Sequence, residues 1–462
     1  MALQRTISPI DGSVFVEREL ASPALLDATL ARAARAAREW RRVPLAQRAA
    51  LCERLVQHMV ERASGLGEQL TRQMGRPIRD TPNELLRGFA ERARTMIELA
   101  PAALADDPAS AKPGFVRFVR REPLGVVLVL APWNYPYLTS VNAVIPALLA
   151  GNAVVQKHSD QTPLCAEHYA QAAAAAGLPD GVLSHVVCTH DDVARLVQDP
   201  RVQLVLFTGS TAGGHAVMRA ASERFVPVGL ELGGKDPAYV RADADFDSAL
   251  ENTIDGAMYN AGQSCCAVER IYVHASVYDR FVEAAVALVR KYTLGSPLDP
   301  ATTLGPLARA GNAAAVRERI ADAVARGARA LVDEREFPLS RPGTAYLAPQ
   351  VLVDLERDMR IVREETFGPV ACINRVASDE DAVARMNDSA FGLTASIWTR
   401  DTEAALRIAG ELETGTCFMN RCDYLDPELP WVGVKDSGRG CTLSKLGYAQ
   451  LTRPKSFHFR LA

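Results

Sequence analysis

The sequence predicts an α/β protein with two doubly wound α/β domains and a small additional β-sheet. Short, wholly apolar segments alternate with segments of helical periodicity in the middle of the chain, and a second alternation of the same kind follows. Apolar strands of this type are typical of parallel sheets that are covered on both faces. A chain of 462 residues has room for about three structural units.

The first hundred residues are predicted to be mostly helical. Ser22 can cap a helix that begins at Pro23, and Leu26 and Leu30 then recur at helical spacing. We expect two further helices at 45–62 and 84–99.

The first α/β alternation predicts a nucleotide-binding sheet. Its expected strands are 126–130, 153–156, 182–187 and 204–207. The segments between them, 140–149, 164–176 and 191–198, are long enough to be crossover helices.

The second alternation predicts another α/β domain. Its expected strands and helices are 271–273, 276–292, 313–327, 350–353, 370–375 and 380–386. Between the helical front end and the first alternation, residues 115–119 alternate between apolar and polar types, which predicts a strand that is exposed on one side or pairs outside its own domain.

Composition and charge exclude several classes of protein. The chain has 52 basic and 55 acidic residues, a net charge of −3, and no long basic segment, so we expect neither nucleic-acid binding nor membrane association. Its longest apolar run, 124–131, is far shorter than the ~20 residues that a membrane helix needs. Nine cysteines without a CxxC pair or a signal-like N-terminus predict reduced thiols, a cytoplasmic location and no metal site.

Two segments at the ends of expected strands are candidates for binding a coenzyme. Gly209 and Ser210 follow strand 204–207 in a loop that lacks the GxGxxG spacing but can still hold a phosphate at a helix start. A plain strand-to-helix turn is the slightly favoured alternative for this loop. Lys157 and Asp160 follow strand 153–156 and could bind ribose hydroxyls, and a carboxylate there would repel the extra phosphate of NADP. A loop salt bridge explains these two residues about equally well.

The segment 262–266 contains two adjacent cysteines among small residues, which suits a nucleophile beside an oxyanion site. A buried structural cysteine is the more common use of this residue type, and spacing alone does not choose between Cys265 and Cys266. His274 is a poor partner for either thiol because it directly follows an expected strand, which disfavours a Cys-His hydrolase.

Two further polar residues have apolar neighbours. Glu231 lies between two leucines, which would raise its pKa and suit a general base, and an ion pair with Lys235 is the alternative. Asn134, just past strand 126–130, could donate to an oxyanion or simply hold a turn.

Taken together and in order, these segments resemble the aldehyde dehydrogenase superfamily over nearly the whole chain. The matching motifs are Pro132-Trp133-Asn134, Lys157 with Gln161-Thr162-Pro163, Phe207-Thr208-Gly209-Ser210, Glu231-Leu232-Gly233-Gly234-Lys235, Gly262-Gln263-Ser264-Cys265, Glu364-Glu365-Thr366-Phe367-Gly368-Pro369, Asn420, and Lys435 with Ser437-Gly438.

The resemblance implies oxidation of an aldehyde to an acid with NAD(P). It makes Cys265 the nucleophile, Asn134 an oxyanion donor, and Glu231 the base that activates water to hydrolyse a thioester. Because acylating relatives usually lack this base, the resemblance favours a hydrolytic enzyme.

The resemblance also implies a set of coenzyme contacts. Glu365 would hold the nicotinamide ribose, Phe367 would bound the ring, and Ser210 would meet the pyrophosphate. Lys157 and Asp160 would meet the adenosine ribose, with NAD expected and NADP as the alternative because Asp160 is shorter than the usual glutamate. The remaining expected coenzyme contacts are Trp133, Gly209, Leu232 and Gly233.

Domain boundaries and assembly follow from the same resemblance. It implies a coenzyme-binding domain from 1–111 and 124–232, a catalytic domain from 233–440, and a bridging sheet from 112–123 and 441–462, in which the tail 455–461 pairs with strand 115–119. Such a sheet implies a homodimer or homotetramer. Cys441-Thr442 replaces the Arg-Glu that often stands in the family, which we expect to affect packing and subunit contacts but not the chemistry.

The expected substrate contacts are Tyr135, Asn142, Arg421 and Trp431. Arg421 could bind the distal carboxylate of a semialdehyde such as succinic semialdehyde, whereas Trp431 could pack against an aromatic aldehyde, and the sequence leaves both open. A catalytically silent structural protein on the same fold is the third hypothesis, against which the set of Cys265, Glu231 and Asn134 argues.

Overall fold

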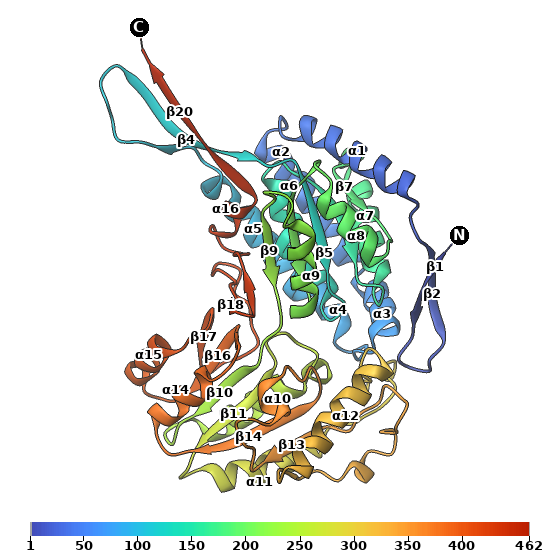
Figure 1. The fold of residues 1–462 in the computed structure, drawn as a ribbon, viewed down its shortest axis with the longest axis vertical. Coiled ribbons are helices and arrows are strands. Elements are labelled where there is room, and N and C mark those ends of the chain that lie inside the picture. Colours follow the sequence, from blue (N-terminus) through green and yellow to red (C-terminus); the bar gives the residue numbers. More distant parts are fainter. Residues whose placement is uncertain (1, 462) are drawn as a thin grey trace.

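The computed structural model describes residues 2–461 and contains two large, mostly parallel sheets, as predicted. The six-stranded sheet has the order β19-β9-β8-β5-β6-β7, and the seven-stranded sheet has the order β12-β13-β14-β11-β10-β16-β17. Figure 1 shows the two sheets one above the other, each with its own helices. No helix within residues 2–461 is long and apolar enough to cross a membrane.

The six-stranded sheet contains three of the predicted strands nearly as expected. Its strands in spatial order are β19 (Gly438–Arg439), β9 (Val228–Glu231), β8 (Val202–Thr208), β5 (Val126–Ala131), β6 (Ala153–His158) and β7 (Leu183–His185). Every residue of β5 is buried, as a central strand between two helical layers requires. β7 is shorter than the predicted 182–187. β19 comes from the range assigned to the catalytic domain but pairs antiparallel with β9.

Helices cover both faces of this sheet. They are α1 (Pro23–Trp40), α6 (Pro136–Leu149), α7 (Pro163–Ala176), α8 (His190–Gln198) and α9 (Thr211–Ala221), with α2 (Leu45–Glu61) and α3 (Ala63–Met74) packed outside. Ser22 caps α1 as expected, and the indole nitrogen of Trp40 at the end of α1 donates to the carbonyl of Leu148 at 2.9 Å.

The predicted helix 84–99 is interrupted. A short helix α4 (Thr81–Asn83) leads into a π-helical turn η1 (Glu84–Phe89), and a regular helix α5 (Ala90–Ala103) follows. Wider π turns are often found at functional sites because they re-aim side chains. A hairpin of β1 (Leu3–Ile7) and β2 (Val14–Glu19), which the sequence did not predict, precedes α1.

The seven-stranded sheet contains the second α/β alternation. Its strands are β12 (Arg329–Ala330), β13 (Gln350–Val353), β14 (Val370–Val376), β11 (Val268–His274), β10 (Asp236–Val240), β16 (Thr394–Trp398) and β17 (Thr416–Met419). Its helices are α10 (Phe246–Met258), α11 (Tyr278–Val289), α12 (Ala310–Ala325), α13 (Arg360–Arg363), α14 (Asp379–Asn387) and α15 (Thr402–Glu411), with the short turns η2 (Tyr259–Gly262) and η3 (Glu334–Glu336).

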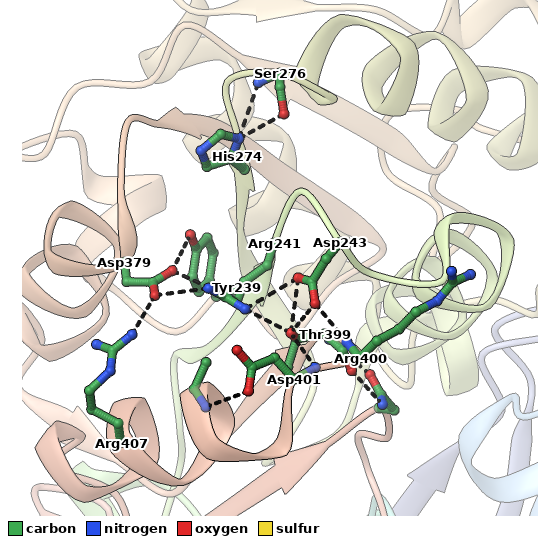
Figure 2. Close-up of polar contacts among 12 residues, drawn as sticks. Tyr239, Arg241, Asp243, His274, Ser276, Asp379, Thr399, Arg400, Asp401 and Arg407 are labelled. Atoms are coloured by element: carbon green, nitrogen blue, oxygen red, sulfur yellow. Dashed lines mark hydrogen bonds and ion pairs between the residues drawn. The ribbon is translucent and has the colours of Figure 1, made fainter.

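The carboxyl edge of this sheet is filled by ion pairs (Figure 2). Asp379 accepts hydrogen bonds from Tyr239, Arg241 and Arg407, and Asp243 accepts from Thr399. Open α/β sheets commonly bind ligands at their carboxyl edge. Here the charged and polar side chains at that edge bind one another instead. The segments that hold Cys265 and Glu365 instead precede β11 and β14, and therefore lie at the amino edge.

A narrow antiparallel sheet projects from the body of the molecule (Figure 1). It consists of β3 (Asp107–Pro108), β4 (Phe115–Pro123) and β20 (Thr452–Arg460), and β4 and β20 are paired along their whole length. The predicted pairing of strand 115–119 with the tail is therefore confirmed. Phe118 and Phe457 stack at 4.5 Å between ring centres, and the side chain of Phe459 beside them is exposed. The remaining elements are the pair β15 (Phe391–Gly392) and β18 (Val434–Lys435), and the helix α16 (Gly447–Gln450).

Candidate functional site

Three cavities join along the seam between the two sheets. The first, of about 580 Å³, lies at the carboxyl ends of β5, β6 and β8, and a second of about 340 Å³ continues from it past Trp133 and Gly209. The third, of about 360 Å³, shares Cys265 and Glu231 with the second. Cys265 and Glu231 therefore lie at the junction of the second and third cavities. A ligand in the second cavity and another in the third would meet at these two residues. We name them after the ligand parts that the sequence leads us to expect there: the adenosine-side, central and substrate-side cavities.

Cys265 is placed by a tight turn before β11. Asn260, Ala261 and Gly262 all have positive φ angles, of 53°, 55° and 70°. A Cβ atom at position 262 would collide with the carbonyl of Gly368, so this position requires glycine. The turn holds this loop against the segment around Gly368. It places Cys265 in the walls of the central and substrate-side cavities.

The two adjacent cysteines have different surroundings. Cys265 is partly exposed and lines both the central and the substrate-side cavity. Cys266 is buried, lines the substrate-side cavity only, and donates to Asp423 Oδ1 at 2.8 Å. A hydrogen bond with Cys265, together with burial, raises the pKa of Cys266 well above its usual value. Cys266 is thus held as a thiol. Burial also raises the pKa of Asp423 to about 6, although hydrogen bonds from Cys266 and Ser264 oppose this shift.

Asn134 lies beside the same loop. Its side-chain nitrogen donates to the carbonyl of Gln263 at 3.2 Å, and Asn260 in turn donates to the carbonyl of Asn134 at 3.3 Å. An amide nitrogen has two hydrogens, so one remains for a second acceptor. Asn134 therefore does not merely hold a turn: it is packed against the cysteine loop and lines the central cavity.

Glu231 ends β9 and faces both the central and the substrate-side cavity. Burial raises the pKa of Glu231, while hydrogen bonds from Thr442 and Thr208 and the nearby charge of Arg92 oppose the rise. Thr208 donates to Glu231 Oε2 at 3.1 Å, and Thr442 donates to Oε1. Thr442, the second residue of the Cys441-Thr442 replacement, therefore contacts this carboxylate directly, in addition to the packing that the sequence leads us to expect of it.

The structure contradicts the alternative of an ion pair between Glu231 and Lys235. The ammonium group of Lys235 instead pairs with Glu269 and donates to Thr366 Oγ1 at 2.8 Å. Glu269 accepts the backbone N–H of Phe367 at 2.9 Å as well. This buried pair anchors the segment that carries Glu365 and Phe367.

Glu365 and Phe367 both line the central cavity. The ring of Phe367 packs edge-on against Trp133 at 5.5 Å between centres, and Glu365 Oε1 accepts the backbone N–H of Gly234 at 3.2 Å. A side chain at Gly233 would collide with the carboxylate of Glu365, which explains the glycine there. Burial, followed by the charge of Glu269, raises the pKa of Glu365 to about 8.

The adenosine-side cavity contains the other predicted coenzyme residues. Lys157 is buried at the end of β6, and Asp160 lies three residues further in the following loop. Ser210 caps α9 by accepting from the N–H of Gly213 at 3.2 Å, so the helix begins at the cavity wall. The loop salt bridge considered for this region exists, but it joins Asp160 to Arg309, not to Lys157.

The substrate-side cavity brings together three of the four predicted substrate residues. Tyr135, Asn142 and Trp431 line it, together with Arg92 from α5. The structure does not bring Arg421 into this lining: its side chain is exposed and lies 3.5 Å above the ring centre of Tyr424. The guanidinium is therefore stacked on a neighbouring aromatic ring outside the cavity.

Three residues that matter at the site were not identified from the sequence: Arg92, Thr442 and Arg309. Arg92 is one of many arginines in an amphipathic helical region, where a solvated face is the ordinary explanation. Arg92 is 5% exposed, and its burial, which it shares with Arg48 and Arg76, becomes apparent only in the fold. His274 lies at the carboxyl end of β11, opposite to Cys265, and pairs with Ser276 at 2.8 Å (Figure 2).

Known proteins resemble the chain along its whole length. A family model described as "Aldehyde dehydrogenase family" matches residues 2–457. The succinate-semialdehyde dehydrogenase (NADP+) 1 of Mycobacterium tuberculosis strain H37Rv is 37% identical over 453 residues, which are 98% of each chain. That of Mycobacterium ulcerans is 36% identical over 454 residues, also 98% of each chain.

Solved structures agree with the sequence relatives. The succinic semialdehyde dehydrogenase of Streptococcus pyogenes in complex with NADP+ superposes with a TM-score of 0.94 at 29% identity, covering 99% of this chain and 100% of the other. An NAD-dependent aldehyde dehydrogenase from Sinorhizobium meliloti superposes with a TM-score of 0.94 at 32% identity, covering 100% and 92%. The thiol, carboxylate and amide at the junction of these cavities, together with the match along the whole chain, show that the chain belongs to the aldehyde dehydrogenase family and is an NAD(P)-dependent aldehyde dehydrogenase.

Proposed function

We propose that this enzyme oxidises aldehydes that carry a second, anionic group, of which a short semialdehyde with a distal carboxylate is the simplest. The observation that carries the proposal is the state of Arg92 in the substrate-side cavity. Its Nη1 donates to the carbonyl of Leu138 at 2.9 Å and to Asn142 Oδ1 at 3.3 Å. Among residues 2–461, these two hydrogen bonds from Nη1 are the side-chain contacts of Arg92 with an acceptor, and neither acceptor is a carboxylate.

A buried cation without a carboxylate partner is costly unless a ligand supplies the charge. Burial lowers the pKa of Arg92 despite the opposing charge of Glu231, which fits a charge that is only partly compensated. The other buried arginine of the cavity, Arg76, is by contrast paired with Glu84.

Two neutral donors in the same cavity also lack partners. The side-chain nitrogen of Asn142 and the hydroxyl of Tyr135 are both buried without a hydrogen-bond partner, and both residues line the cavity with Arg92. Buried polar atoms in folded proteins nearly always have a hydrogen-bond partner. These two donors therefore favour a ligand whose oxygens accept hydrogen bonds. The names of the mycobacterial and streptococcal relatives point to the same substrate class.

In this proposal Cys265 acts as the nucleophile. Its thiolate attacks the carbonyl carbon and forms a C–S bond, and the oxyanion that results is stabilised by the free amide hydrogen of Asn134 and by the Cys265 backbone N–H. Bound NAD(P)+ supplies the acceptor for the hydride that leaves this carbon. Glu231 then removes a proton from water, the hydroxide attacks the thioester, the C–S bond breaks, and the acid and the Cys265 thiolate are released.

The residues present fit the coenzyme. The adenosine-side and central cavities form one path along the carboxyl edge of the six-stranded sheet, where dinucleotides bind in such folds. Ser210 and Gly209 at the start of α9 would hold the pyrophosphate, with Lys157 and Asp160 at the adenosine ribose. Glu365, Phe367, Trp133, Leu232 and Gly233 would surround the nicotinamide end. We propose NAD as the preferred coenzyme, with NADP also accepted.

We further infer that the chain assembles as a homodimer or homotetramer through the sheet of β3, β4 and β20. The support is its projection from the body and the exposed aromatic side chain of Phe459. The proposed division into a coenzyme-binding domain (1–111 and 124–232), a catalytic domain (233–440) and bridging segments needs one adjustment, because β19 extends the coenzyme sheet.

The substrate proposal is tested by replacing each arginine separately. Arg92→Gln should raise the KM for succinic semialdehyde about tenfold or more relative to the change for hexanal, since charge-assisted hydrogen bonds are lost only with the first substrate. Arg421→Ala is the matched control, because it removes a guanidinium outside the cavity. Equal effects of Arg92→Gln on both aldehydes, or a preference of the wild type for benzaldehyde against Trp431, would overturn the proposal.

A further inference from the structure

We propose that Arg309 sets the coenzyme selectivity of this enzyme by neutralising Asp160. The inference goes beyond the substrate proposal, and it rests on placing the adenosine ribose between Lys157 and Asp160. Its basis is a contact between two parts of the molecule that the sequence separates by 149 positions.

Arg309 reaches across the seam from the residue before α12 to the loop that follows β6. Its Nη2 donates to Asp160 Oδ1 at 2.7 Å, and its Nε donates to Gln161 Oε1 at 3.0 Å. The guanidinium thus donates from two nitrogens to two adjacent residues of one loop. Arginine suits this arrangement better than lysine because its donors are fixed in one plane.

The loop itself is fixed, so Asp160 has little freedom to turn away from the cavity. Thr6 donates to the carbonyl of Asp160 at 2.6 Å. Gln161 donates from its side chain to the carbonyls of Ile7 and Gln73, at 3.1 Å and 2.5 Å. The backbone of the loop is therefore held by β1 and α3, and the carboxylate of Asp160 is held by Arg309 and by the hydroxyl of Ser159, which donates to Oδ1 at 3.1 Å.

The charges at this end of the adenosine-side cavity decide which coenzyme is tolerated. Its lining contains Lys157, Asp160, His190 and Arg309 as ionisable residues. Burial alone would raise the pKa of Asp160, but the charge and hydrogen bond of Arg309 outweigh it and lower the pKa, so the carboxylate stays ionised. An unpaired carboxylate would repel the 2′-phosphate that distinguishes NADP from NAD.

With Arg309 in place, that repulsion is offset. The pair Asp160–Arg309 carries no net charge, which leaves the cation of Lys157 to act on the phosphate. The carboxylate of Asp160 accepts Arg309 through Oδ1, so Oδ2 remains for a ribose hydroxyl of NAD. One arrangement therefore accepts both coenzymes, and the selectivity depends on a residue outside the coenzyme sheet.

The test measures coenzyme binding without any aldehyde, so it is independent of the substrate proposal. Trp133 lines the coenzyme path, and its fluorescence can be followed while NAD or NADP is added to the full-length enzyme. The fragments 5′-AMP and 2′,5′-ADP, which differ by the 2′-phosphate, serve as a second pair of ligands.

Arg309→Gln should weaken NADP binding about tenfold and change NAD binding less than about threefold, because the exposed charge of Asp160 then acts on the phosphate. Arg5→Gln is the control: Arg5 is a nearby arginine that pairs with Glu17 and does not touch Asp160. Asp160→Asn should tighten NADP binding, which tests the placing of the ribose.

The double variant decides whether Arg309 acts through Asp160. In the Asp160→Asn background, Arg309→Gln should alter NADP binding by less than about threefold, since no carboxylate remains to be neutralised. A tenfold loss in that background, an equal loss for NAD and NADP in the single variant, or a wild type that binds only NAD would each overturn the proposal. Retained thermal stability of the variants, measured alongside, separates a binding effect from misfolding.

Discussion

The hydroxyl group of Thr442 donates a hydrogen bond to the carboxylate of Glu231, although the two residues lie 211 positions apart along the chain. The backbone of Thr442 is held by two hydrogen bonds with Trp431, at 2.8 and 3.1 Å. Thr442 therefore links a wall of the substrate-side cavity to the proposed base, and it is a positioning residue for Glu231.

Thr442→Val should shift the pH dependence of the acid-forming step. The hydrogen bond from Thr442 stabilises the ionised form and lowers the pKa of Glu231, so its loss raises that pKa further. A base works only when deprotonated, and the acid limb of the steady-state rate should therefore move to higher pH by about one unit. The pre-steady-state burst of NADH should keep its amplitude, because acylation does not use Glu231.

The control for this variant is Thr452→Val, which removes a buried hydroxyl that bonds to the carbonyl of Tyr448 away from Glu231. An unshifted profile for Thr442→Val, with the burst intact, would show that Thr442 does not act through Glu231.

Replacement of the two adjacent cysteines should have unequal effects. Cys265→Ala should lower aldehyde oxidation by about a thousandfold or more, since no nucleophile remains to form the thioester. Cys266→Ala should retain a rate within about tenfold of wild type, because that thiol is held protonated against Asp423. Rates of NADH formation measure both, and labelling with iodoacetamide shows which thiol reacts first. Greater loss with Cys266→Ala would reverse the assignment.

Glu365 should make the coenzyme-free enzyme less stable as pH rises. Its folded pKa of about 8 lies above its ordinary value of 4.5, so between these values the folded state keeps a proton that the unfolded chain releases. The free energy of unfolding therefore falls as pH increases through this window. Glu365→Gln should raise the Tm by about 5 °C at pH 8.5, and by little at pH 5, since each kcal/mol moves the Tm of a chain of 462 residues by roughly 1 °C.

Its neighbour Glu364 is the matched control with the opposite sign. Arg360 and Arg319 lower the pKa of Glu364, so its stabilisation is present above pH 4.5 and is lost as pH falls. Glu364→Gln should lower the Tm slightly at pH 8.5, as calorimetry would show. A Tm for Glu365→Gln that tracks the wild type at every pH would contradict the assignment.

The projecting sheet should determine the oligomeric state. Phe459→Asp places a charge beside Phe457 on an exposed face, and it should convert the proposed dimer or tetramer into smaller species in light-scattering measurements. Leu406→Asp, at a 70% exposed position on α15, is the control and should leave the mass unchanged. A wild type that is already monomeric would refute the proposed assembly.

The sequence predicted the parallel strands and the linear motifs because both are local. The apolar run that became β5 identified a buried strand, and the small residues around Cys265 indicated a tight loop. Residues that depend on contacts across the fold were missed or misassigned. Arg421 was an attractive cation beside Asn420, whereas the fold brings Arg92 to the cavity from a helix more than three hundred residues earlier. The sequence likewise did not show that Lys235 pairs with Glu269 or that Thr442 binds Glu231, because the partners lie on strands or loops that are distant along the chain.

The pairing of β4 with β20 also constrains how the chain is made. On the ribosome, β4 emerges more than three hundred residues before the strand that completes it, so an unpaired, partly aromatic edge persists through most of synthesis. Nascent chains would be open to edge-to-edge aggregation during that interval. The six-stranded sheet is likewise incomplete until β19 has been made and pairs with β9. Synthesis of β20 thus completes the projecting sheet, and a chain without β20 would fold in its middle but leave β4 unpaired along its edge.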